Sequence, residues 1–311
     1  MISIIKTIDI VKEPTEFYGS KKLMIEYVLS IVLLCLFRKQ GIYVFILIVP
    51  ILLFVMKKYF FKTIIISLSS IIITLLFFGP IASLMNAKEA SPVEMLSVPL
   101  QQIARVMNIN PDSLTEDEKD EVYIFIPKEV LEMYIAEISD PVKDNIDIDM
   151  IKNNKIEFIK IWYEVGKKNK GLYIQSFLYG SVGYFYPSAS TIHPWSTVMQ
   201  PYSLDTVVIK NTPKLKRYNN YLYYAGTTLY KDIPIASTFV CNALPFWIMI
   251  IVSSILIRER NYKMIIPILF IAVFWFSLLL GPVYCVRYSY PLLICIPLMI
   301  IMPFCRYKSI E

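Results

Sequence analysis

The stretch M-L-S-V-P-L-Q-Q-I-A-R-V-M, residues 95–107, follows a long apolar run, at the point where a chain leaving a bilayer would emerge. Pro99 suits the first turn of a helix, because the N–H that proline lacks has no helical partner there. Apolar side chains then recur at spacings of three and four and share one helix face: Leu100, Ile103, Ala104 and Met107. Three polar side chains lie beside or opposite that face: Gln101, Gln102 and Arg105.

This pattern allows two interpretations. A helix lying in the membrane interface would bury the apolar face in lipid and offer two amides and a guanidinium to a ligand above it. An ordinary surface helix of a folded domain would show the same spacing. The pattern alone leaves both open.

The composition indicates a multi-pass membrane protein. Of the 311 residues 56% are hydrophobic and 14% aromatic, and the mean hydropathy is +0.54; soluble domains are less apolar than this. Residues 85–240 hold 19 acids and 16 bases, whereas the rest of the chain holds 6 acids and 15 bases. The excess of positive charge therefore flanks the apolar runs, which indicates membrane topology and gives no sign of a nucleic-acid partner.

Six apolar runs predict a mainly α, polytopic protein with six transmembrane helices. The predicted spans are Leu23–Phe37, Ile42–Met56, Thr63–Met85 (broken near Gly79-Pro80), Val240–Ile257, Met264–Leu280 and Leu292–Phe304. Ten Lys and Arg residues flank the ends of the spans on one side of the membrane, and three flank the ends on the other side. The positive-inside rule then places both termini in the cytoplasm of a cell-membrane protein.

The predicted domains follow from these spans. They are a cytoplasmic flank (1–22), three transmembrane helices (23–85), an α-rich extracytoplasmic domain between helices 3 and 4 (86–237), three further transmembrane helices (238–304) and a cytoplasmic tail (305–311). Within the outer domain Thr115 and Glu118 have capping-box spacing. A helix is expected over Glu129–Ile138, ended by Asp140-Pro141. An amphipathic helix is expected over Lys155–Lys168, where Ile156, Ile159, Trp162 and Tyr163 recur at helical spacing.

Other signals are weak or missing. The five cysteines lie in or beside apolar runs without the spacing of metal ligands, so neither a metal site nor a disulfide framework is expected. No phosphate-binding glycine loop, nucleophile elbow or cleavable signal peptide is visible in the sequence. No cofactor is indicated by these patterns.

Five segments together resemble a family of bacterial multi-pass proteins related to GT-C glycosyltransferases. They are L-F-R-K-Q-G-I-Y-V (36–44), M-L-S-V-P-L-Q-Q-I-A-R-V (95–106), S-D-P-V-K (139–143), G-Y-F-Y-P (183–187) and V-R-Y-S-Y-P (286–291). The block Q-Q-I-A-R is the most specific of them. The likeness covers nearly the whole chain and implies a hexosyltransferase that takes a sugar from a polyprenyl-phosphate carrier, such as undecaprenyl phosphate, on the outer membrane face.

The resemblance departs from the GT-C pattern in one respect. GT-C enzymes generally place a catalytic Asp or Glu in their first outer loop, and most relatives carry several more spans before the part matched here. The first outer loop of this chain, Arg38–Gly41, has no carboxylate. The chain therefore resembles the C-terminal part of such an enzyme, for cell-surface glycan assembly, with the catalytic half missing or encoded separately as a partner.

Arginines and glutamines are the candidate ligands of the carrier phosphate or the sugar. The resemblance favours Arg287, at the outer end of the last turn between spans, and Arg105 with Gln101 and Gln102. A snorkelling anchor is the alternative for Arg287.

Two further residues are candidates for catalysis. His193, the only histidine, is a candidate base beside Trp195, whose indole would stack on a sugar. Asp140 is a candidate acceptor-binding carboxylate or, alternatively, a turn cap.

Two other functions remain open. A polysaccharide polymerase or ligase also has many spans, a large outer loop and outer-face arginines. An inactive remnant or a binding module for a glycan acceptor would retain the same surface without catalysis. A carboxylate in an early outer loop of a longer parent favours the glycosyltransferase, whereas activity without one favours the polymerase or ligase.

Overall fold

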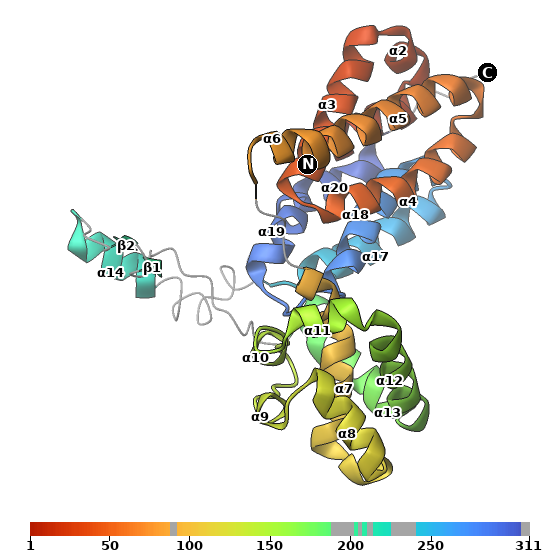
Figure 1. Ribbon diagram of the computed structural model, residues 1–311. Helices are drawn as coiled ribbons and strands as arrows, with labels where there is room; N and C mark the ends of the chain where they lie inside the picture. Colours follow the sequence, from red (N-terminus) through yellow and green to blue (C-terminus); the bar gives the residue numbers. More distant parts are fainter. Residues whose placement is uncertain (88–91, 188–201, 205–206, 210–213, 225–240, 306–311) are drawn as a thin grey trace. The chain divides into compact units, whose positions relative to one another are not determined.

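The computed structural model describes residues 1–311 except 88–91, 188–201, 205–206, 210–213, 225–240 and 306–311 (Figure 1). The mainly helical class is confirmed, with one short antiparallel hairpin that the sequence analysis did not predict, β1 (Tyr202–Leu204) and β2 (Val207–Ile209). The chain forms two compact units. Unit 1 comprises residues 1–97, 245–281 and 294–311, and unit 2 comprises residues 98–244 and 282–293.

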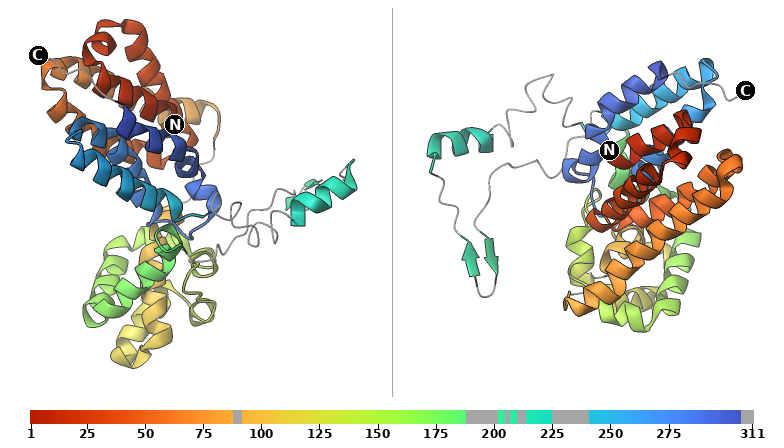
Figure 2. Two further views of the ribbon diagram at one scale, coloured as in Figure 1. Left: turned by 180° about the vertical axis from the view of Figure 1, so that it is seen from behind. Right: turned by 90° about the horizontal axis from the view of Figure 1, so that it is seen from above.

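Unit 1 is a helical bundle. Its helices are α1 (Ile2–Lys12), α2 (Pro14–Gly19), α3 (Lys21–Phe37), α4 (Gln40–Val55), α5 (Phe60–Leu76), α6 (Ala82–Leu84), α17 (Leu244–Arg258), α18 (Ile265–Leu278) and α20 (Ile296–Ile301). Helix α3 packs against α5 and α4, and α4 packs against α18 (Figures 1 and 2). Residues 1–22, which the sequence analysis treated as a flank, form α1 and α2, and α1 packs on α3 and α18.

Each predicted span corresponds to a helix, but only two helices are long and apolar enough to cross a membrane among the described residues. These are Lys57–Leu84 and Val286–Phe304, the latter comprising α19 (Val286–Ile294), α20 and a final turn. At Gly79-Pro80 the first of them continues through a π-helical turn, Phe77–Ile81, where a break was expected. Proline lacks the N–H of a regular helix, and one wider turn accommodates it without ending the helix.

Helix α5 carries its polar side chains inside and its apolar side chains outside. Ile66 is one of its five buried residues, and the other four bear hydroxyl groups, at 0–2% exposure: Thr63, Ser67, Ser70 and Thr74. Large apolar residues are exposed along the helix, at 51–80% exposure: Phe61, Ile65, Leu68, Ile72 and Leu75. Ser70 and Thr74 donate to the carbonyls of Ile66 and Ser70 in the preceding turn, so their hydroxyls are satisfied within the helix. Helices in water show the reverse distribution.

Unit 2 is built around α7 (Ser97–Ile109). Its other helices are α8 (Glu116–Phe125), α9 (Lys128–Leu131), α10 (Asp140–Lys143), α11 (Ile148–Asn153), α12 (Lys155–Lys168), α13 (Lys170–Ser181), α14 (Lys216–Tyr224) and all of α19 except its last residue. Helix α12 packs against α8 and α13. The capping box of Thr115 and Glu118 is present at the start of α8, as predicted.

Two expectations within unit 2 are wrong. The helix expected over Glu129–Ile138 ends at Leu131, and the chain then turns so that Ile135 pairs with Ile138. Helix α12 has the expected bounds but a different buried face, since Ile156 and Ile159 are 85% and 59% exposed. Phe158, Ile161 and Val165 are buried instead. Periodicity identified an amphipathic helix but not the face that its neighbours cover.

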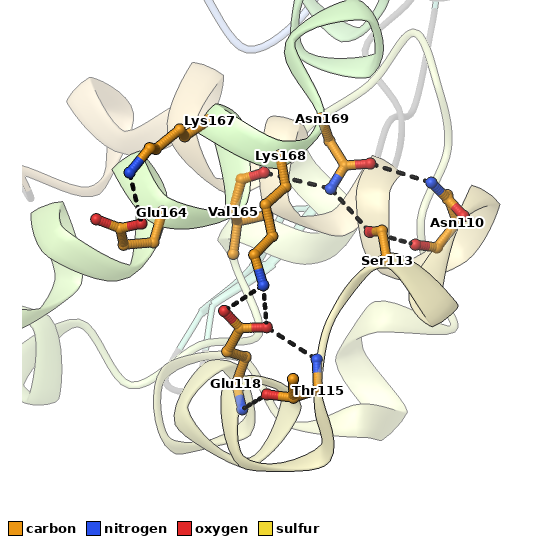
Figure 3. A network of polar contacts seen from close by, with 9 residues as sticks. All are labelled: Asn110, Ser113, Thr115, Glu118, Glu164, Val165, Lys167, Lys168 and Asn169. Carbon is orange, nitrogen blue, oxygen red and sulfur yellow. Dashed lines mark hydrogen bonds and ion pairs between the residues drawn. The ribbon is translucent and has the colours of Figure 1, made fainter.

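A polar network joins the start of α8 to the junction of α12 and α13 (Figure 3). Asn169 donates to the Ser113 hydroxyl at 2.8 Å and accepts from the Asn110 amide at 3.2 Å. Lys168 Nζ lies 2.6 Å from both carboxylate oxygens of Glu118. Glu118 therefore ties two helices together in addition to capping its own.

Low pH is expected to weaken the ion pair between Glu118 and Lys168. The Lys168 ammonium, and after it the backbone N–H of Thr115, lower the pKa of Glu118. The Glu118 carboxylate stabilises the folded state fully at pH values above its pKa in the unfolded chain, which is about 4.3. This stabilisation is lost as the pH falls through the lower pKa that the carboxyl has in the folded state. Glu118→Gln should therefore destabilise unit 2 by about 1 kcal/mol at pH 7 and by little at pH 3. Thermal unfolding of Glu118→Gln and of the wild type at pH 7 and pH 3 measures this loss of stability, with Glu121→Gln as the control. A difference in stability between variant and wild type that is equal at both pH values would contradict the prediction.

Candidate functional site

Residues 100–107 of helix α7 are buried on every face, whereas Asn108 and Ile109 at its end are exposed. Leu100 and Ile103 are 0% and 1% exposed, and the polar Gln101 and Arg105 are only 7% and 8% exposed. Residues 100–107 therefore lie inside unit 2, so the exposed polar face that both the interface helix and the surface helix require is absent from this part of α7. The spacing of three and four identified one packed face, but the polar side chains between are covered as well.

Arg105 carries a buried positive charge without an acidic partner among the described residues. Its NH1 group donates to the Tyr134 hydroxyl at 3.2 Å and its NH2 group to Gln175 Oε1 at 2.8 Å. The guanidinium lies 4.7 Å from the centre of the Tyr179 ring. Its Nε is buried and has no hydrogen-bond partner within the described part of the chain. Burying an unpaired charge is costly, so this arrangement favours an anionic ligand.

Gln101 fastens the segment between α9 and α10. Its Nε2 donates to the backbone carbonyls of Ile135 and Ile138, at 2.8 and 2.7 Å. Two hydrogen bonds from one amide hold both ends of the turn that contains Ala136 and Glu137. The Gln101 Oε1 is buried and lacks a partner among the residues that the structure describes. The Gln101 amide is thus structural at its nitrogen, while its oxygen is left as an unused acceptor.

Gln102 is part of the packing between α7, α12 and α13. Its Oε1 accepts from the Trp162 indole N–H at 2.8 Å, and its Nε2 donates to the Tyr173 carbonyl at 3.3 Å. Both ends of the amide are therefore engaged by unit 2 itself. Trp162, which sequence periodicity assigned to a helix face, supplies the donor.

The segment before α19 joins the same turn. The Ser139 N–H and hydroxyl both donate to the Pro282 carbonyl, at 2.9 and 3.1 Å, and Ile138 pairs with Val283. Gln101 therefore holds a turn that in turn holds the residues leading into α19. This arrangement brings together segments that are about 180 residues apart, which no local pattern in the sequence could predict.

Arg287 lies in the first turn of α19 and is exposed. Its NH2 group donates to the Tyr288 hydroxyl at 3.0 Å. Arg105 and Arg287 belong to the same compact unit, one buried and one at its surface.

Comparison with known protein families matches residues 2–310 of the chain to DUF6020, a family of unknown function. The chain belongs to the DUF6020 family. No curated protein matches it, and no solved structure matches it.

Asp140 of this DUF6020 protein lies in the first turn of α10, after Ser139. Its Oδ1 is 2.9 Å from Nζ of Lys143, a lysine that is only 3% exposed. Asp140 therefore balances the positive charge of the buried Lys143 ammonium, which is a structural role.

The structure adds a residue that sequence reasoning missed. Glu137 lies in the turn that Gln101 holds, is half-buried, and forms no ion pair or hydrogen bond with any described residue. Burial, and in addition the charge of Glu137, raise the pKa values of both Tyr134 and Tyr284, although the hydrogen bond from Arg105 lowers that of Tyr134. The DUF6020 sequence contains many glutamates, and nothing in its local pattern distinguishes this one.

The remaining sequence candidates, His193 and Trp195, lie outside the described residues. Their proposed contacts with a sugar stay predictions. Of the candidates that the structure describes, it brings Gln101, Gln102 and Arg105 together on α7, with Asp140 and Arg287 in the same unit of the DUF6020 protein.

Proposed function

We propose that this protein is part of a membrane glycosyltransferase of the GT-C type. It uses a sugar linked to undecaprenyl phosphate, or to a similar polyprenyl phosphate, and acts on a glycan acceptor in cell-surface assembly. Unit 1 crosses the cell membrane several times, both termini face the cytoplasm, and unit 2 lies on the outer side. A separately encoded N-terminal half would be its partner.

The distribution of side chains on α5 supports the membrane part of this proposal. Hydroxyl groups point inward and large apolar groups point outward along a helix that is long enough to span a bilayer. Helices in lipid favour small and hydroxyl-bearing residues where they pack together, because close approach and hydrogen bonding replace the hydrophobic effect. The positively charged flanks support the orientation.

Arg105 is the observation that carries the choice of ligand. Its guanidinium is 8% exposed, has no acidic partner among the described residues and keeps one N–H without an acceptor. A phosphate monoester or diester would supply both the missing charge and the missing acceptor, since guanidinium groups bind phosphate oxygens through paired N–H donors. Exposed Arg287, in the same unit, would be a second contact for the headgroup.

Binding of farnesyl phosphate tests this proposal. The full chain in lipid nanodiscs is titrated with farnesyl phosphate and with farnesol, which lacks the phosphate. We expect farnesyl phosphate to bind more tightly than farnesol. Loss of one charged hydrogen-bonding group costs about 1.5–3 kcal/mol, so Arg105→Met should weaken binding of farnesyl phosphate roughly tenfold to a hundredfold.

Further variants separate binding from folding. Arg105→Lys keeps the charge without the planar fork and should bind with intermediate affinity, whereas Arg217→Met, at an exposed position of α14, should bind as the wild type does. Arg287→Met, at another exposed position, should weaken binding without changing thermal unfolding. Equal affinity for farnesyl phosphate and farnesol would refute the phosphate site.

A further inference from the structure

The turn between α9 and α10, two helices labelled in Figure 1, contains a carboxylate that no described residue neutralises. Glu137 is half-buried, and the described residues place no lysine or arginine within ion-pair distance of it. The other carboxylates near this turn differ. Asp140 pairs with Lys143 at 2.9 Å, and Asp144 lies 3.4 Å from the same ammonium.

The backbone around Glu137 is held on both sides. The Gln101 amide donates to the carbonyls of Ile135 and Ile138, at 2.8 and 2.7 Å, and Ile135 pairs with Ile138 across the turn. Two hydrogen bonds from Ser139 to the Pro282 carbonyl fix the next residue. The backbone that carries Glu137 is therefore held in place, which limits the positions that its side chain can reach, as a reacting group requires.

Helix α7 contacts the segment that carries Glu137 at two points. The Tyr134 hydroxyl accepts a hydrogen bond from Arg105 at 3.2 Å, and Tyr134 lies three residues before Glu137. Gln101, one helical turn before Arg105, donates to the carbonyls on either side of Glu137. Neither Arg105 nor Glu137 has a charged partner among the described residues, so unit 2 brings one unpaired cation and the segment with one unpaired carboxylate together.

We infer that Glu137 is the catalytic base of the transfer reaction and that Arg105 receives the phosphate that leaves. This inference rests on the proposed function and supplies the carboxylate that the first outer loop lacks. It places the base on the turn of unit 2 that Gln101 holds, and Gln101 lies one helical turn before Arg105 on α7.

The reaction balances with these two groups. Glu137 takes the proton of the acceptor hydroxyl while the acceptor oxygen forms a bond to the anomeric carbon of the sugar. The bond between that carbon and the phosphate oxygen breaks, and its electron pair leaves with the polyprenyl phosphate. Arg105 stabilises the negative charge that develops there, and Glu137 later releases the proton to water.

Azide provides a test that needs no known acceptor. Farnesyl-phosphate-linked glucose, mannose, galactose and N-acetylglucosamine are offered in turn to the full chain in nanodiscs, and release of farnesyl phosphate is measured. Water must be deprotonated to react, whereas azide is already an anion and needs no base. Since general base catalysis typically contributes about 10²–10⁴-fold, Glu137→Ala should slow hydrolysis by at least 10²-fold. Added azide should restore release and yield the glycosyl azide.

The controls distinguish a base from a structural residue and from a failed phosphate site. Glu132→Ala, at an exposed position of the same segment, should react like the wild type. Glu137→Gln should still bind farnesyl phosphate. Hydrolysis by Glu137→Gln within threefold of the wild-type rate would overturn the inference, and so would a loss that azide does not restore. Binding of farnesyl phosphate without release from any donor by the wild type would overturn the role of Glu137 but leave the phosphate site standing.

Discussion

Ile72→Arg is expected to prevent stable insertion of the protein into membranes. Ile72 lies near the middle of the apolar helix Lys57–Leu84 and is 54% exposed. If this side chain faces lipid, arginine near the helix centre costs about 2.5–3.5 kcal/mol of insertion free energy. If it faces water, the same substitution changes stability by less than about 0.5 kcal/mol. The yield of folded protein in carbonate-washed membranes measures the difference.

Unit 2 offers a matched control for this substitution. Ile124 on α8 is 56% exposed, almost the same as Ile72, but belongs to the unit that we place outside the membrane. Ile124→Arg should leave the yield of membrane-bound protein unchanged. Equal yields of the two variants would mean that α5 does not face lipid, and the membrane topology proposed here would have to be abandoned.

Gly183→Ala is expected to destabilise unit 2 by about 1–3 kcal/mol, the usual cost of forcing an extra group into a packed core. A Cβ atom at Gly183 would lie 2.1 Å from Cδ2 of the Tyr284 ring, far inside contact distance. Tyr284 is 4% exposed and packs edge-on against Tyr184, so the ring has little room to move. The substitution would therefore push apart the turn at Gly183 and the segment that leads into α19.

Gly180→Ala is the control for Gly183→Ala. Gly180 lies in α13, three residues earlier, and a Cβ atom there would meet nothing within 4 Å. Alanine favours a helix over glycine by up to about 1 kcal/mol, so this variant should unfold at the same or a higher temperature. Thermal unfolding of both variants in nanodiscs makes the comparison. A Gly183→Ala variant as stable as Gly180→Ala would show that the close approach to Tyr284 is not required.

Local patterns predicted much of the secondary structure. The apolar runs became helices, the capping box formed at Thr115, and α12 begins and ends at the expected residues. These features depend on neighbours within four residues along the chain, so the sequence contains the necessary information. The turn after Leu131 was missed because its hydrogen bonds come from Gln101 and from the segment at Pro282, both distant in sequence.

The candidate site likewise combines features that the sequence predicts with features that depend on distant segments. The sequence by itself determined that α7 is a helix, that Gln101, Gln102 and Arg105 are its polar residues, and that the chain is mainly helical with apolar runs. Only the tertiary structure decided that these polar residues are buried, that Arg105 lacks an acidic partner among the described residues, and that Gln101 holds the turn that contains Glu137. Burial and electrostatic neighbours depend on which distant segments pack together, and helix periodicity does not specify that choice.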